Sequence, residues 1–229
     1  MTIILTNDDS INAPGIAALR AATRNLSEPA IVVAPQTPLS GCGHQVTTHS
    51  PIPVEKRSAT EYAVGGMPAD CTRLALYQLC PEVTWVLSGI NAGGNMGVDR
   101  YISGTIAAVR EATFHGIPGI AISQYRNRQK SIDWQRATQW TADILVKLMQ
   151  SPPEPYSFWN VNLPHLEPEQ PEPEVVFCEP SNEPLPLNYR MEGDRFHYVG
   201  DYQQRQRTPG TDVEVCFSGN IAVTKVRLC

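Results

Sequence analysis

Two adjacent carboxylates, Asp8 and Asp9, directly follow the short apolar run TIILT. Such a run predicts a buried strand, and open α/β sheets assemble ligand sites at the carboxyl ends of their strands. Adjacent strand side chains point to opposite faces, so both acids reach one centre only if the backbone turns there. Two close carboxylates repel unless a proton or a cation lies between them, which favours a hard cation such as Mg2+ or Mn2+. In an isolated Asp-Asp pair, the more frequent arrangement is one Asp capping the next helix and one in solvent.

Polar, glycine-rich loops follow two further predicted strands. Ser40 comes after the strand AIVVAP, and Asn91 comes after the strand VTWVLS. In a parallel sheet these loops emerge at the same edge as the acidic pair. Neutral oxygens from Ser40 and Asn91 would complete an all-oxygen ligand shell and leave positive charge for an anionic substrate. Each glycine-rich loop taken alone would more often be an ordinary turn.

A third segment carries residues suited to binding an anion. Ser103, Gly104 and Thr105 open a predicted helix that continues as IAAVREATF, with Ser103 as its N-cap. Free backbone amides at such a helix end attract phosphate, although a capped end without a ligand is the more common case. The G-x-G-x-x-G pattern of dinucleotide-binding folds does not occur.

The histidines and cysteines give weaker signals. None of the five histidines forms an H-x-x-x-H or H-E-x-x-H pair, which argues against a histidine-rich metal centre. His44 follows Ser40 closely, where it would contact substrate or an outer ligand or, in the more frequent case, hydrogen-bond within its loop. Cys42 shares that loop, but no His and orienting acid can be assigned to it as partners of a nucleophile.

Composition narrows the possible partners of the chain. With 229 residues, 41% hydrophobic and 18% charged, it can bury a large core. The net charge of −5 argues against binding a nucleic-acid polymer, which requires clustered Lys and Arg. No apolar stretch is long enough to span a membrane, so we expect no membrane partner. Six cysteines without a C-x-x-C pair, in a sequence that opens on MTIILTNDD without a signal peptide, predict free thiols and a cytoplasmic location.

Short apolar runs alternate with helix-like segments through the first two thirds of the chain. This alternation predicts β-α-β units around a mostly parallel sheet, which is an α/β fold. The expected strands are 2–6, 30–35, 83–88 and 118–123, and the expected helices are 15–26, 71–80, 103–116 and 131–150. Residues 44–64 are expected to form a hairpin at the sheet edge.

The last third of the chain has a different composition. Ten of the twenty prolines lie between residues 151 and 186, which excludes continuous helix and leaves separate strands at 157–163 and 174–178. Residues 187–227 predict two β-hairpins, the second turning at Ser218-Gly219-Asn220. We therefore expect an α/β core over residues 1–186 and a β-hairpin extension over 187–229. Exposed strand edges recruit other chains, so this extension predicts self-association to a dimer or tetramer.

Eight short motifs follow one another in the order found in the SurE (survival protein E) nucleotidases, which the chain resembles over almost its whole length. They are TNDDS with INAPGI, VVAP with SG five residues on, GMPADC, LSGINAGGNMG, YISGTIAAVREA, HGIPGIAIS, NVNLP and PGTD. Each motif is modest alone, but eight in sequence make coincidence very improbable.

The resemblance implies a Rossmann-like core, one divalent metal ion (Mn2+ or Mg2+), and hydrolysis of nucleoside 5'- and 3'-monophosphates to nucleoside and phosphate. Carried over by position, it implies Asp8, Asp9, Ser40 and Asn91 as metal ligands, and Asn95, Ser103, Gly104 and Thr105 as residues facing the substrate phosphate. Asp8 and Asp9 would be the catalytic residues. Either could accept the proton of an attacking water, for which we favour Asp9, or attack phosphorus directly.

The chain departs from the family pattern N-D-D-G at Ser10, where a left-handed backbone would be less comfortable than for glycine. We expect a small adjustment there and no loss of the metal. Two other classes share part of the pattern. A receiver-like Mg2+-binding signalling domain also has an acidic pair after its first strand, but it requires a phosphoacceptor Asp where this chain has Pro or Ser-Gly. A haloacid-dehalogenase-type phosphatase requires Asp-x-Asp in place of adjacent acids.

Overall fold

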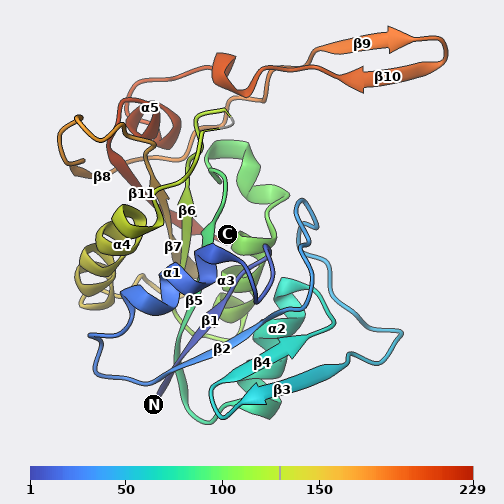
Figure 1. Ribbon diagram of the computed structural model, residues 1–229, viewed down its shortest axis with the longest axis vertical. Coiled ribbons are helices and arrows are strands. Elements are labelled where there is room, and N and C mark those ends of the chain that lie inside the picture. Colours follow the sequence, from blue (N-terminus) through green and yellow to red (C-terminus); the bar gives the residue numbers. More distant parts are fainter. Residues whose placement is uncertain (129, 229) are drawn as a thin grey trace.

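A sheet of nine strands forms the centre of the computed structural model, which describes residues 1–128 and 130–228 (Figure 1). The strands are β1 (Thr2–Thr6), β2 (Ala30–Pro35), β3 (Val54–Ser58), β4 (Glu61–Val64), β5 (Val83–Asn91), β6 (Gly119–Gln124), β7 (Ser157–Leu163), β8 (Val175–Phe177) and β11 (Ile221–Arg227). Their order is β3-β4-β2-β1-β5-β6-β7-β11-β8. The neighbours from β4 to β7 are all parallel, so the predicted α/β fold with a mostly parallel sheet is confirmed.

Helices cover both faces of this sheet. They are α1 (Pro14–Ala22), α2 (Pro68–Leu74), its π-helical continuation η1 (Ala75–Leu79), α3 (Gly104–Phe114), α4 (Trp134–Met149) and α5 (Asp212–Phe217), with short 3-10 turns η2 (Gly97–Tyr101) and η3 (Tyr202–Gln204). Leu19 of α1 and Leu145 of α4 belong to the hydrophobic cluster on one face. Cys71 of α2 and Val109 of α3 belong to the cluster on the other face. Because alternate strand residues point to opposite faces, a strand between these two layers must be apolar throughout.

The first β-α unit brings the site into position. All five residues of β1 are buried, since the strand has β2 and β5 as neighbours and helices above and below. At the start of α1, a Cβ added to Gly15 would lie 1.9 Å from the carbonyl oxygen of Ile90. Glycine is therefore required there, because it lets α1 pack directly on the end of β5.

The hairpin expected within residues 44–64 is present. β3 and β4 pair antiparallel, and β3 is the edge strand of the sheet. All five residues of β3 are exposed, and they include Glu55, Lys56 and Arg57. Charged side chains of this kind discourage a further strand from pairing with the free edge.

The prediction of a second hairpin near the carboxyl terminus is wrong. Residues 212–217 form helix α5, and β11 then pairs antiparallel with β7 in the central sheet (Figure 1). The run VEVCF is too short for its periodicity to separate a strand from a helix. Val213 and Cys216, three residues apart, both enter one hydrophobic cluster, which favours the helix. The core therefore does not end at residue 186, because β11 supplies one of its strands.

The first predicted hairpin does form a separate two-stranded sheet. Strands β9 (Tyr189–Glu192) and β10 (Arg195–Tyr198) pair antiparallel and project away from the body of the molecule (Figure 1). Every residue of both strands is exposed. Within the described part of the chain, no helix has the length and apolar character needed to cross a membrane.

Candidate active site

The acidic pair lies at the turn where the chain leaves β1. Ser10 has a φ of 89°, so the backbone is left-handed there on a residue other than glycine. Two donors hold its carbonyl oxygen, Asn7 Nδ2 at 2.7 Å and the backbone N–H of Ala13 at 3.1 Å. The N–H of Asn12 donates to Ser10 Oγ at 3.3 Å. These bonds offset part of the cost of the conformation, which is about 1–3 kcal/mol for such a residue.

Asp8 is nearly buried, with 4% of its surface exposed. Its Oδ1 accepts a hydrogen bond of 2.6 Å from the Thr105 hydroxyl. Burial, together with the negative charge of Asp9, raises the pKa of Asp8 to about 6, although the Thr105 bond acts in the opposite direction. A buried carboxyl with a raised pKa beside a second acid is the condition that a bound cation relieves.

The beginning of α3 contacts Asp8 directly. A Cβ added to Gly104 would lie 2.7 Å from Cys42 Sγ and 2.9 Å from Asp8 Oδ2, so only glycine permits this approach. Ser103 caps the helix as predicted, because its hydroxyl oxygen accepts from the N–H of Ile106 at 3.1 Å. The helix end and the acidic turn are therefore in direct contact.

The loop after β5 reaches the same corner. Asp9 Oδ2 accepts from the N–H of Ala92 at 3.0 Å. Asn91 Nδ2 donates to the carbonyl oxygen of Gly93 at 2.7 Å, and no described residue donates to Asn91 Oδ1. The loop after β2 is also attached here, since the N–H of Leu39, next to the exposed Ser40, donates to the carbonyl oxygen of Asp8 at 2.7 Å.

These groups have the chemistry of a site for a hard divalent cation. Two carboxylates, an amide oxygen and a hydroxyl suit Mg2+ or Mn2+, which prefer oxygen ligands. Among the described residues, no group of three or more His, Cys, Asp or Glu side chains is arranged to hold a metal ion. A site at this corner would therefore depend on the neutral oxygens of Ser40 and Asn91 as well as on the two acids.

Asn95 is held rigidly by residues to which the sequence assigned no role. Asn162 Oδ1 accepts from the Asn95 N–H at 2.8 Å, and Asn160 Nδ2 donates to the Asn95 carbonyl oxygen at 2.9 Å. The Asn95 side chain donates through Nδ2 to Ser123 Oγ at 2.8 Å. The two asparagines of the NVNLP motif, both fully buried in β7, thus fix the loop that follows β5.

A second buried group holds the next residues of that loop. Arg205 Nη1 forms a 2.6 Å ion pair with Asp99 Oδ2, and Arg205 Nη2 donates to the Met96 carbonyl oxygen at 3.2 Å. Asp212 Oδ2 accepts from the N–H of Gly97 at 2.8 Å. Asp212 belongs to the PGTD motif, so that motif anchors the loop and does not itself reach the acidic pair. No pattern in the sequence predicts that Asp99 and Arg205 form a pair.

His44 and Cys42 are accounted for by local contacts. His44 Nε2 lies 2.8 Å from Glu111 Oε2, and Glu111 also contacts Arg73 at 2.6 Å and His115 at 3.1 Å. Burial opposes ionisation of Glu111, but these hydrogen bonds outweigh it and lower its pKa to about 2. Burial and the charge of Asp8 raise the pKa of Cys42, so its thiol is a poor nucleophile. The described cysteines are free thiols, as expected, and Cys229 lies outside the described residues.

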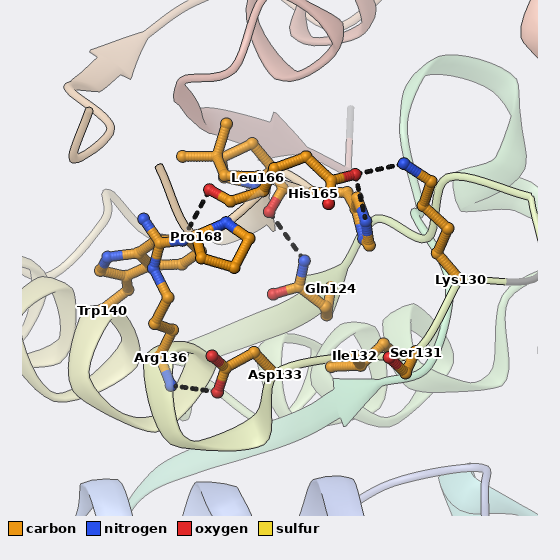
Figure 2. A pocket seen from close by; sticks show the side chains of 12 residues that line it. Gln124, Lys130, Ser131, Ile132, Asp133, Arg136, Trp140, His165, Leu166 and Pro168 are labelled. Atoms are coloured by element: carbon orange, nitrogen blue, oxygen red, sulfur yellow. Dashed lines mark hydrogen bonds and ion pairs between the residues drawn. The ribbon is translucent and has the colours of Figure 1, made fainter. Parts of the chain in front are cut away.

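A separate pocket of about 530 Å3 opens at the ends of β6 and β7 (Figure 2). Its charged lining residues balance in number, because Lys130 and Arg136 face Asp133 and Glu167, and Lys130 pairs with Glu167. Burial lowers the pKa of His165 in its wall, which favours the neutral ring. None of the predicted site residues lines this pocket, and its balanced charge does not favour an anion.

Comparisons with known proteins identify the family and the fold of the chain. The family model described as "Survival protein SurE" matches residues 3–183. A protein of Nostoc sp. strain PCC 7120 is 59% identical over 100% of both chains. A protein of Paramagnetospirillum magneticum named "5'-nucleotidase SurE" is 35% identical over 98% of this chain and 88% of its own length. The crystal structure of the SurE protein from Aquifex aeolicus superimposes with a TM-score of 0.88 at 30% identity, covering 100% of this chain and 94% of that one. The chain therefore belongs to the SurE family.

Proposed function

We propose that this chain is a divalent-metal-dependent phosphomonoesterase that hydrolyses nucleoside 5'- and 3'-monophosphates to nucleoside and phosphate. The observation that carries the proposal is the direct contact between the Asp8–Asp9 turn and the beginning of α3, through Thr105 and Gly104. Such contact lets a cation on the carboxylates and the amides of a helix end act on one phosphate. The name "5'-nucleotidase SurE" carried by relatives supports the nucleotide as substrate.

The proposed ligands of the cation are Asp8, Asp9, Ser40 and Asn91. One Mn2+ or Mg2+ held by them would polarise the phosphoryl group and neutralise charge that develops during hydrolysis. The Thr105 bond holds the Asp8 carboxylate in one orientation, and the Ala92 bond does the same for Asp9. Fixed carboxylates cost little reorganisation when a substrate arrives.

The proposed phosphate contacts are Asn95, Ser103, Gly104 and Thr105. The α3 helix of 11 residues presents its first amides beside the acidic pair, and its dipole favours an anion there. Because the Asn95 backbone is fixed by Asn160 and Asn162, its place beside the phosphate would be set before substrate binds. Asp9, which is more exposed than Asp8, would accept the proton of the attacking water.

Two further proposals concern the setting of the enzyme. The exposed β9–β10 hairpin would join protomers into at least a dimer, because its side chains have no cover within one chain. The enzyme would work in the cytoplasm, since the five described free cysteines suit a reducing compartment.

A substrate panel with and without chelation tests the proposed function. We expect hydrolysis of several nucleoside monophosphates in Mn2+ or Mg2+, poor hydrolysis of free sugar phosphates, and loss of all activity after dialysis against EDTA, because the site has only oxygen ligands for a hard cation. Readdition of Mn2+ should restore the rate. Full turnover of p-nitrophenyl phosphate in EDTA would refute the metal, and a sugar phosphate hydrolysed far faster than every nucleotide would refute the substrate class.

A further inference from the structure

Two arginines beside the candidate site form no ion pair with a carboxylate of the described residues. Arg100 is only 7% exposed, and its Nε donates to the carbonyl oxygen of Gly97 at 2.6 Å. Arg110 is half-buried, and its Nη2 donates to the carbonyl oxygen of Arg100 at 2.9 Å. Among the described residues, neither guanidinium has a carboxylate oxygen within 4.0 Å. Both guanidinium groups donate to backbone carbonyl oxygens, and Arg110 also contacts the His44 ring.

Other arginines in the same part of the molecule form ion pairs with carboxylates. Arg73 contacts Glu111 at 2.6 Å, and Arg205 contacts Asp99 at 2.6 Å. Both oxygens of Glu111 are occupied by Arg73, His44 and His115, so Glu111 does not neutralise its sequence neighbour Arg110. Removing a charge from water without an oppositely charged partner costs free energy. Arg100 and Arg110 are therefore exceptions among the arginines of this region, and their lack of an ion pair requires a reason.

The other neighbours of the two arginines are a histidine, a tyrosine and a buried aspartate. Arg110 Nη1 lies 3.4 Å from His44 Nδ1, and His44 Nε2 lies 2.8 Å from Glu111 Oε2. The Arg100 guanidinium carbon lies 5.6 Å from the centre of the Tyr101 ring. Asp212 is near enough to Arg100 to feel its charge, but the oxygens of Asp212 accept backbone N–H groups and do not bond to Arg100. Burial and the charge of Arg100 both lower the pKa of Arg110, so the two guanidinium groups repel each other.

The pair lies next to the segments of the candidate site. Arg100 precedes Ser103 by three residues, and Arg110 lies on α3 itself. The N–H of Gly43, in the loop of Ser40, donates to the carbonyl oxygen of Ile102 at 2.9 Å. The loop that carries Ser40 is thus attached to the segment that carries Arg100.

We propose that Arg100 and Arg110 form a second anion site, distinct from the acidic pair, that takes a phosphoryl dianion. Two guanidinium groups supply the charge and the paired donors that such an anion prefers. The ligand has two possible sources with the same chemistry: a second phosphoryl group on the substrate, or the inorganic phosphate that hydrolysis releases. The second source rests on the proposed function, whereas the site itself does not.

Inorganic phosphate titrated into the metal-free protein tests the site. In EDTA no cation is bound at the acidic pair, and the methionine variants show which part of the calorimetric binding depends on the arginines. We expect saturable binding, weakened at least about tenfold by Arg110→Met or Arg100→Met because each removes charge-assisted hydrogen bonds. The matched control, Arg136→Met, removes an arginine already paired with Glu172 and should bind phosphate as the parent does.

Melting temperatures give a readout that a merely structural role would not move. Phosphate should raise the melting temperature of the parent and of Arg110→Lys, but not that of Arg110→Met. Absence of saturable binding to the metal-free parent, or equal binding by the parent and both methionine variants, would overturn the proposal. Because no turnover is involved, failure here is separate from failure of the proposed function.

The holoenzyme identifies the source of the anion. If it is a second phosphoryl group, Arg110→Met raises the KM for a nucleoside 3',5'-bisphosphate and leaves that for the 5'-monophosphate unchanged. If the anion is the released inorganic phosphate, Arg110→Met leaves the KM values of both substrates unchanged, and only inhibition by inorganic phosphate weakens. Either result supports the site, and a variant that changes neither contradicts it.

Discussion

Residues 92–101 and the β9–β10 hairpin both lie outside the central sheet, yet they are held in opposite ways. Buried polar groups fix the loop. Asn160 and Asn162 form hydrogen bonds with the Asn95 backbone, and Arg205 and Asp99 form hydrogen bonds with the Met96 backbone. The hairpin instead presents large apolar side chains to solvent, and they are Tyr189, Met191, Phe196 and Tyr198. The loop is therefore shaped before a ligand arrives, whereas the hairpin leaves an exposed apolar surface that we propose contacts another chain.

The largest expected effect comes from breaking the anchor of the loop. Arg205→Met leaves Asp99 as an unpaired buried carboxylate, which costs about 3–5 kcal/mol of unfolding free energy. It should also lower kcat/KM about tenfold or more, because the Met96 carbonyl loses its donor and Asn95 shifts. Urea unfolding, and kinetics at a temperature where the variant is folded, measure the two effects.

The matched control is Lys225→Met, which breaks a surface pair with Glu154 and should change neither quantity appreciably. If Arg205→Met keeps full activity per folded molecule, the loop does not need its anchor and the contrast with the hairpin fails.

The next effect concerns the pH dependence of stability without metal. Burial and the charge of Asp9 raise the pKa of Asp8 from 3.8 to about 6. A group with a raised folded pKa contributes stability that is fully present below its unfolded pKa and is lost as pH rises through its folded pKa. In EDTA the parent should therefore lose about 3 kcal/mol between about pH 4 and pH 6 that Asp8→Asn does not lose. Urea unfolding at each pH measures the unfolding free energy. If this free energy changes with pH in the same way for parent and variant, the pKa of Asp8 is not raised in the folded protein.

The smallest effect on the folded monomer is expected at the hairpin. Met191 and Phe196 are paired across β9 and β10, and each is 67% exposed. Replacing both with serine should change monomer stability by less than about 0.5 kcal/mol, yet dissociate the assembly. Light scattering at micromolar concentration should give at least twice 25.2 kDa for the parent and for Val146→Ser, an exposed control on α4. A parent that already has the monomer mass would refute the assembly.

The sequence predicted what local patterns determine. Apolar runs and helix periodicity gave the parallel core, and Ser103 was recognisable as a cap because capping depends on neighbours in the chain. The sequence marked Ser10 as a position where a left-handed backbone would be less comfortable than for glycine, and the structure has that conformation there.

Contacts between distant residues were beyond the reach of the sequence. Asn160 bonds to Asn95 across 65 positions, Arg205 to Asp99 across 106, and Asp212 to Gly97 across 115. No periodicity links such partners, so the anchors of the loop were missed. Helix α5 was missed for a related reason, because tertiary burial of Val213 and Cys216 decided between helix and strand in a short ambiguous run.

Asp9→Asn, assayed for turnover and melting temperature with and without Mn2+, tests the central claim that the acidic pair holds the metal. The change keeps the shape and an oxygen but removes the charge and the base. We predict a loss of turnover of about hundredfold or more. The melting temperature without metal should be unchanged or higher, and the rise on adding Mn2+ should shrink. A variant that stays active, or that melts earlier and responds to Mn2+ as the parent does, would show that Asp9 is not a ligand.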